Sequence, residues 1–279
     1  MDMHKGIMTM IAGLGLSASA GELLTLTNDF GSVAVEPRGA RIVSYVPAGR
    51  GDLLVLLPGG SGGIALCWPW FQFNGPRGRE SPKHGIARYR DFTVVRRNNG
   101  PRQSELELRL VSDAATRKLF PHDFALTVTI RLDERLTVTM TGENTGSTPF
   151  PVTEALHPYF RTSAPLACRV ETDDGTFGDK GFIVEGRSVV FTFKSPDPPF
   201  RLVDPASGQT LLFTASGSPQ SVVWNPGPEG HLRNPTIGPD DWKSFVCVEN
   251  GTFETSHAYT LAPGERHTLV RTIAIGKRK

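Results

Sequence analysis

Strict alternation of apolar and polar residues is the feature that most constrains how this chain can fold. In residues 136–141 the side chains of Leu, Val and Met point one way and three threonines point the other, as in a strand with one face in water. The same period of two recurs in residues 23–27, 41–46, 104–111, 124–132, 135–142 and 265–274. The pattern predicts many short β-strands.

Turn-forming residues separate these segments. The 279-residue chain has 30 glycines and 22 prolines, scattered rather than clustered, and turn pairs such as Asn99-Gly100 and Pro263-Gly264 stand between segments. We find no convincing amphipathic helix, and the best helical candidate is one turn at residues 239–243. We therefore expect an all-β fold, a large antiparallel β-sandwich, formed as a single domain by residues 21–279.

The first 20 residues have two interpretations. Lys5, a mildly apolar stretch at residues 7–16 and the run Ala18-Ser19-Ala20 follow the order of a secretory signal peptide. Asp2 and three glycines favour a disordered start instead. The first interpretation implies a periplasmic or secreted protein, and the second a cytoplasmic one. No part of the chain approaches the run of about 20 apolar residues that a membrane span needs.

The net charge argues against nucleic acid or a membrane as partner, and the cysteines argue against a structural zinc site. A net charge of +2 gives no long-range field that would favour nucleic acid or an anionic membrane. The three cysteines, Cys67, Cys168 and Cys247, cannot all pair within one chain. Cys67 and Cys247 lie in apolar runs that are typical of free buried thiols. No Cys/His cluster has the spacing of a zinc site, so we expect no structural metal.

Three segments are unusual for plain strands, and the first of them contains His84, Gly85 and Arg88. The glycine lets the backbone bend or approach a ligand closely. The segment follows an aromatic run that includes Trp68 and Trp70, whose rings would suit the apolar face of a sugar. Arg88 could then donate to the hydroxyl groups of that sugar. The alternative is a surface loop with a solvated histidine and arginine.

The second segment, residues 152–160, contains a histidine in a strand pattern. Alternation places His157 on the face of Tyr159 and places Glu154 on the opposite face, so His157 and Glu154 should not form a dyad. Pro158 cannot donate to a ladder, which predicts that the strand ends or bulges directly after His157. A histidine at the end of a buried strand can face a cleft, although a structural role is commoner for a single histidine.

The third segment, residues 245–251, ends in a glutamate. Four successive apolar residues predict a strand that is covered on both faces, and Glu249 follows on the face of Phe245 and Cys247. Burial would raise the pKa of this carboxyl group from about 4.3 toward neutrality, as a general base requires. The alternative is a glutamate at the end of a strand that reaches solvent.

These segments, in this order on an all-β chain, resemble the aldose 1-epimerase (galactose mutarotase-like) superfamily. The likeness is strongest to its hexose-6-phosphate mutarotase, or glucose-6-phosphate 1-epimerase, branch, and it covers the chain from about residue 21 to the end. It is specific because several separate motifs agree in order and spacing. The motifs are Gly62-Gly63-Ile64-Ala65-Leu66-Cys67-Trp68-Pro69-Trp70-Phe71, His84-Gly85-Ile86-Ala87-Arg88, Glu154-Ala155-Leu156-His157-Pro158-Tyr159-Phe160, Asp174-Gly175-Thr176-Phe177-Gly178-Asp179-Lys180, Val222-Val223-Trp224-Asn225-Pro226 and Val246-Cys247-Val248-Glu249.

The resemblance implies an isomerase that interconverts the α and β anomers of a hexose or hexose 6-phosphate. It implies His157 as general acid and Glu249 as general base, on opposite sides of the sugar. By the same resemblance, His84 and Arg88 contact the sugar, and Asp179 is a further substrate ligand. It implies no cofactor and no metal, a small-molecule sugar or sugar phosphate as partner, and a monomer.

One position departs from that branch. Its members typically carry an arginine just before the Gly-Gly-Ile motif, where it helps to hold the 6-phosphate, and this chain has Ser61 there. A serine is a much weaker phosphate ligand than an arginine fork. We expect phosphate recognition to be weakened or lost, unless Lys83, Arg77 or Arg79 compensates.

Three other kinds of protein are alternatives to an isomerase. A carbohydrate-binding β-sandwich without catalysis would have no need of both His157 and Glu249. A polysaccharide lyase could use Tyr159 beside His157, although such enzymes often carry an extra helical domain. A metal site built from histidines has no supporting spacing; the candidates are His84, His122, His157 and His231.

Overall fold

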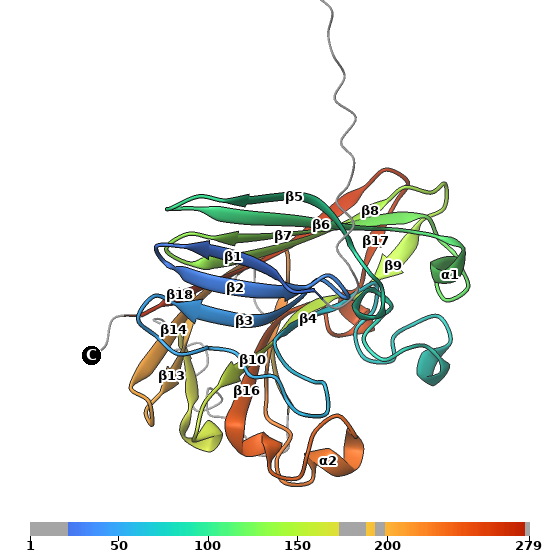
Figure 1. Cartoon of the computed structure of the whole chain (residues 1–279). Coiled ribbons are helices and arrows are strands. Elements are labelled where there is room, and N and C mark those ends of the chain that lie inside the picture. The colour runs from blue at the N-terminus through green and yellow to red at the C-terminus, as the bar shows by residue number, and fades with distance from the viewer. Residues whose placement is uncertain (1–21, 173–187, 193–198, 277–279) are drawn as a thin grey trace, which may run out of the picture.

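The computed structural model describes residues 22–172, 188–192 and 199–276. In this part of the chain, two eight-stranded antiparallel sheets pack face to face (Figure 1). The order of the first sheet is β1 (Leu24–Asn28), β2 (Gly31–Glu36), β3 (Arg41–Pro47), β4 (Ile64–Cys67), β10 (Ala155–Arg161), β16 (Phe245–Gly251), β15 (Gln220–Trp224) and β12 (Ser188–Thr192). The order of the second is β11 (Arg169–Thr172), β13 (Phe200–Asp204), β14 (Gln209–Ser216), β18 (Arg266–Ile275), β8 (Leu136–Asn144), β7 (Phe124–Leu132), β6 (Ser104–Val111) and β5 (Thr93–Asn99). A short pair is formed by β17 (Tyr259–Leu261) and β9 (Phe150–Val152).

The predicted antiparallel sandwich is therefore confirmed. Strands β6 and β7 begin and end at the predicted residues, and β1, β3, β8 and β18 do so within two residues. The threonines of β8 are half-buried on one face while its Leu, Val and Met side chains are buried on the other. The period of two was a sufficient signal here because each strand of this sheet has one apolar face against the core.

Helices in the described residues are single turns. They are α1 (Ala114–Arg117), α2 (Gly230–Arg233) and the 3-10 turns Gly78–Glu80, Ala87–Tyr89, Pro165–Ala167, Asp241–Ser244 and Thr255–His257. The turn expected at residues 239–243 corresponds to the 3-10 turn Asp241–Ser244. None of these described helices is long and apolar enough to cross a membrane.

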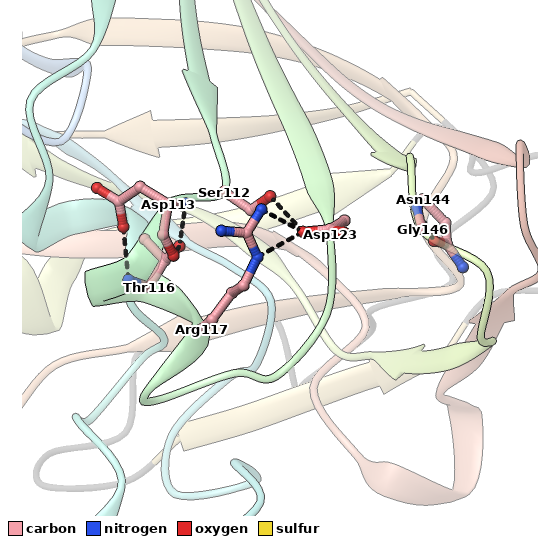
Figure 2. Close-up of polar contacts among 7 residues, drawn as sticks. All are labelled: Ser112, Asp113, Thr116, Arg117, Asp123, Asn144 and Gly146. Carbon is pink, nitrogen blue, oxygen red and sulfur yellow. Dashed lines mark hydrogen bonds and ion pairs between the residues drawn. The ribbon is translucent and has the colours of Figure 1, made fainter.

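The helix α1 shows how a single turn is fixed between β6 and β7 (Figure 2). The Asp113 carboxylate accepts from the Thr116 N–H at 2.6 Å, and the Thr116 hydroxyl oxygen accepts from the Asp113 N–H at 2.7 Å, which completes a capping box. Arg117 and Ser112 both donate to the Asp123 carboxylate at the start of the next strand. Four residues are too few for a periodic pattern, so the sequence did not predict this helix.

Strand β10 does not end or bulge at Pro158, so that prediction was wrong. The strand pairs with β16 both before and after the proline. The missing N–H leaves a local gap in this ladder, on the β16 side. On the other side of the strand, the Tyr159 N–H donates to the Gly63 carbonyl at 2.9 Å and the Arg161 N–H to the Leu53 carbonyl at 2.8 Å. These bonds hold the strand in the sheet across the proline.

Apolar side chains from both sheets fill the space between them. The largest fully buried ones are Trp68, Tyr45, Phe124, Phe150, Phe160 and Phe213. Trp68 packs against Phe124 with ring centroids 4.7 Å apart, which ties the first sheet to the second. The charged side chain of Arg271 is buried between the same sheets.

The glycine-rich run at residues 59–63 lies tightly against its neighbours just before β4. Gly63 has a φ of 69°, and a Cβ at this position would stand 2.2 Å from the Ile42 carbonyl oxygen. Gly60, with a φ of 96°, has no atom within 4 Å of the corresponding point. Glycine at position 63 therefore permits the close approach of two backbones at the entrance to β4.

We expect Gly63→Ala to lower the free energy of unfolding by about 3 kcal/mol or more. A left-handed residue other than glycine costs about 1–2 kcal/mol, and the overlap with Ile42 adds about 1–3 kcal/mol. Gly60→Ala is the control, because it also places a side chain at a positive φ, but in open space. Urea unfolding of both variants measures the difference, and equal losses would contradict the packing explanation.

Candidate active site

The neighbouring strands β10 and β16 bring His157 and Glu249 together. Their register pairs Leu156 with Asn250 and Tyr159 with Cys247, which places His157 opposite Glu249. The His157 Nε2 atom lies 3.4 Å from the Glu249 Oε1 atom. The two groups were expected on opposite sides of a sugar, whereas the structure places them side by side.

Both side chains lie on the face of the sheet that points away from the sandwich core. Leu156, Phe160, Val246 and Val248 belong to the core between the sheets, while Tyr159 and Cys247 belong to a separate apolar cluster on the outer face. Alternation places His157 and Glu249 on that outer face. The prediction that residues 245–251 are covered on both faces is confirmed, because every residue of β16 is buried.

Burial sets the protonation of this pair. Glu249 is 2% exposed, and burial raises the pKa of its carboxyl group from 4.5 to about 8, against the opposing charges of Arg88 and Lys83. Burial, followed by the charges of Arg88 and Lys83, lowers the pKa of His157 well below 6.5. The two groups titrate together, and near neutral pH the pair holds one proton in total. It can therefore supply one acid and one base.

The guanidinium group of Arg88 is held firmly beside the pair. Its Nε donates to the Leu66 carbonyl at 3.1 Å, and its Nη2 lies 3.0 Å from the Cys67 sulfur. Cys67 is a free buried thiol, as are Cys168 and Cys247, and burial raises the pKa of Cys67 to about 12. The thiol is therefore a neutral support for Arg88.

His84 is a neutral hydrogen-bond donor at this site. Its Nδ1 atom accepts from the Gln72 N–H at 3.3 Å, so the ring proton is on Nε2. Burial, with the charges of Arg88 and His157, lowers the pKa of His84 far below 6.5. The His84 ring meets the His157 ring edge-on, with centroids 5.5 Å apart.

The close backbone turn after His84 depends on Gly85. The glycine has a φ of 83°, and a Cβ on it would stand 2.1 Å from the Trp68 carbonyl oxygen. That oxygen accepts from the Ile86 N–H at 2.9 Å. The turn therefore fixes the His84–Arg88 segment against the start of the aromatic run, as the sequence pattern suggested.

Two adjoining cavities open onto these groups. One, of about 480 Å³, contains Glu249 and has aromatic walls made by Phe71, Trp224 and Phe253. The other, of about 370 Å³, is lined by Ser61 and Thr236 and by the cations Arg38, Arg41, Lys83 and Arg88, with Glu36 as the acidic group. Both are lined by Lys83, His84, His157, Tyr159 and Asn234. Together they provide room for a sugar ring and a substituent.

The other candidate residues that the structure describes do not join this cluster. Asp179 lies outside the described residues. Glu154 is completely buried and pairs with His267 at 2.8 Å, so it makes no dyad with His157. His122 packs against Phe120 and Phe150, and His231 is on α2. In the described part of the chain, no group of three or more His, Cys, Asp or Glu residues could hold a metal ion.

Sequence reasoning missed several residues that line the cavities. Trp224 belongs to a motif that carried the resemblance, yet its wall position follows only from the pairing of β15 with β16. Arg38 and Arg41 come from a strand pair far from the site motifs in sequence. No local pattern marks such residues, because the fold alone brings them to the cavity.

The comparison with family models matches residues 22–273 of this chain to aldose 1-epimerase. The chain belongs to the aldose 1-epimerase family. A Salmonella typhimurium protein named "Putative glucose-6-phosphate 1-epimerase" is 27% identical over 266 residues, which cover 86% of each chain. A Cenchrus ciliaris protein of the same name is 28% identical over 226 residues, covering 73% of this chain and 67% of the other.

Solved structures of similar proteins share this fold. The Salmonella typhimurium "putative mutarotase (YeaD)" superposes with a TM-score of 0.77 at 24% identity, covering 92% of this chain and 90% of the other. A galactose mutarotase-like protein from Lactobacillus casei superposes with a TM-score of 0.70 at 16% identity, covering 91% and 100%. The family resemblance inferred from the motifs is confirmed.

The shared proton makes stability fall with rising pH. Above pH 6.5 the unfolded chain has lost the protons of Glu249 and His157, while the folded pair keeps one until about pH 8. We therefore expect a loss of about 1.4 kcal/mol per pH unit between these values, or roughly 2 kcal/mol in total. Glu249→Gln should abolish this component. Urea unfolding of both proteins at pH 6.5 and 8 tests it, and parallel losses would disprove the raised pKa.

Proposed function

We propose that this member of the aldose 1-epimerase family is a mutarotase that interconverts the α and β anomers of a hexose or hexose 6-phosphate. The observation that carries the proposal is the buried His157–Glu249 pair, 3.4 Å apart, which lines a cavity with aromatic walls. We assign the activity to one domain, residues 21–279.

The proposed reaction needs one proton removed and one supplied. The Glu249 carboxylate takes the proton from O1, a C1–O1 double bond forms, and the electron pair of the C1–O5 bond moves to O5. Protonated His157 gives its proton to O5, so the ring opens to the aldehyde. Rotation about C1–C2 and the reverse transfers close the ring on the other face. Because O1 and O5 are bonded to the same carbon, two adjacent groups can reach both.

The pair keeps its proton count through these steps. Before ring opening Glu249 is ionised and His157 is protonated, and afterwards both are neutral. Burial disfavours charge on both groups, so the neutral state is the resting one. Hydroxyl groups of the sugar would stabilise the charged state that starts the reaction. The charge of Arg88 favours the Glu249 carboxylate and disfavours protonated His157, which makes His157 the stronger acid.

The remaining site residues would orient the sugar. His84 and Arg88 are the proposed donors to its hydroxyl groups, and both line the second cavity beside the pair. The Trp224 and Phe253 rings would cover an apolar face of the ring. Asp179, outside the described residues, remains a proposed substrate ligand on the strength of the motif alone.

The charge of the second cavity supports an anionic substituent on the sugar. Arg41 is engaged by Glu36 at 2.8 Å and Arg38 by Asp91 at 3.7 Å. Among the described residues Lys83 has no ion-pair partner, and its side chain lines both cavities. The relatives named for glucose 6-phosphate agree with such a substrate. Ser61, in place of the expected arginine, favours a weaker hold on phosphate.

Loss of the base should abolish catalysis while the site stays intact. We expect wild-type protein to accelerate the anomerisation of freshly dissolved α-D-glucose, α-D-galactose or α-D-glucose 6-phosphate, followed by polarimetry or NMR. Glu249→Gln should reduce kcat by about 10²–10⁴-fold, the contribution of a positioned proton transfer.

Binding measurements separate this proposal from its alternative. If Glu249→Gln folds normally and binds the same sugar, its lost turnover identifies Glu249 as the base. If wild type binds sugars and accelerates none of them, the protein is a carbohydrate-binding sandwich and the proposed activity is wrong.

Position 61 should control the preference between phosphorylated and free sugars. We expect Ser61→Arg to raise kcat/KM for glucose 6-phosphate relative to glucose by roughly tenfold or more, because a guanidinium fork binds phosphate through charge-assisted bonds. Ser61→Ala is the control, since it too removes the 2.6 Å hydrogen bond to Thr236 but adds no cation. An equal preference in both variants would show that position 61 does not face the phosphate.

A further inference from the structure

Arg271 crosses the sandwich core and contacts the strand that carries Glu249. It belongs to β18 of the second sheet and is 1% exposed. Its Nε atom donates to the Asn250 side-chain oxygen at 2.9 Å, and its Nη2 donates to the Val248 carbonyl at 3.4 Å. These two residues flank Glu249 on β16, so Arg271 binds the strand from the face opposite the cavity.

Two aromatic rings of the core also pack against Arg271. Its guanidinium group lies 5.1 Å from the ring centroid of Phe200 and 5.2 Å from that of Phe213. A buried ion costs free energy that an apolar side chain of similar volume would not cost, and replacing such ions is often neutral or stabilising. A methionine would fill this part of the core, so packing alone does not explain an arginine here.

We propose that Arg271 is a positioning residue for the reaction: it fixes the backbone on both sides of Glu249 and places a positive charge behind that carboxyl group. The inference rests on the proposed mutarotase function. It assigns to a residue of the core, outside every motif of the site, a direct influence on the proposed general base.

Arg271 acts from a side that the substrate does not reach. The charges of Arg88, Lys83 and Arg271 each lower the pKa of Glu249, which burial raises to about 8. Arg88 and Lys83 line the cavities, where an anionic substituent would partly neutralise them, whereas the charge of Arg271 comes through the sheet. Other titratable groups around Glu249 are His84, His157, Cys67, Tyr159, Cys247 and Glu254.

Three variants separate the charge of Arg271 from its anchoring contacts. Arg271→Met removes both, Arg271→Gln keeps an amide donor without the charge, and Asn250→Ala keeps the charge without the main anchor. We expect both uncharged variants to move the alkaline limb of the kcat/KM–pH profile upward by roughly half a pH unit or more, because that limb reports loss of the pair's one proton. Asn250→Ala should leave that limb in place and lower the plateau rate.

A structural role for Arg271 would give a different pattern. If all three variants lose plateau rate or stability and none moves the alkaline limb, Arg271 only braces the sheets and the proposal fails. It also fails if neither Arg271→Met nor Arg271→Gln folds while Asn250→Ala does, because the charge would then be needed for folding.

A second measurement does not depend on activity. Because loss of the charge raises the pKa of Glu249 further, Arg271→Gln should continue to lose stability with rising pH beyond about pH 8, where wild type levels off. Urea unfolding between pH 7 and about pH 9 detects this continued loss. If wild type proves inactive on every sugar, the proposed function fails, while this readout still tests Arg271.

Discussion

The hydrogen-bond register between β10 and β16 is the constraint on which the site depends. It sets His157 opposite Glu249, with their nearest atoms 3.4 Å apart. A slip of one residue would turn His157 toward the sandwich core and separate the pair. The register is specified on both faces of the sheet, because every residue of β16 is buried. The same register therefore satisfies both the packing of the core and the geometry of the His157–Glu249 pair.

Burial disfavours the ionised form of Glu249, and cations on two sides of the carboxyl group partly offset this cost. The Glu249 carboxyl group, 2% exposed, favours its neutral form, whereas its proposed role as a base requires that it can ionise. Arg88 approaches from the cavity, supported by the neutral Cys67 thiol. Arg271 approaches from the core through the backbone of β16. The neutral tautomer of His84 adds a donor without adding charge beside His157.

The sequence predicted the strands more fully than the site. Alternation located β6 and β7 to the residue, because each has one face against an apolar core. The proline rule failed at β10, since bonds on the far side of the strand compensate for the missing N–H. Motifs indicated His157, Glu249, His84 and Arg88, but their distances depend on strand pairing between segments that lie far apart in sequence. Arg38, Arg41 and Arg271 carried no local signal for the same reason.

Strands position the His157–Glu249 pair, whereas loops contribute much of the lining of the second cavity. His157 and Glu249 lie within paired strands, where register leaves their separation little freedom. The second cavity takes much of its wall from connecting segments, two of which Ser61 and Thr236 join through their hydroxyl groups at 2.6 Å. Loops tolerate substitution better than paired strands do. We therefore propose that an arginine-to-serine difference at position 61 changes which sugar is bound while the His157–Glu249 pair stays in place.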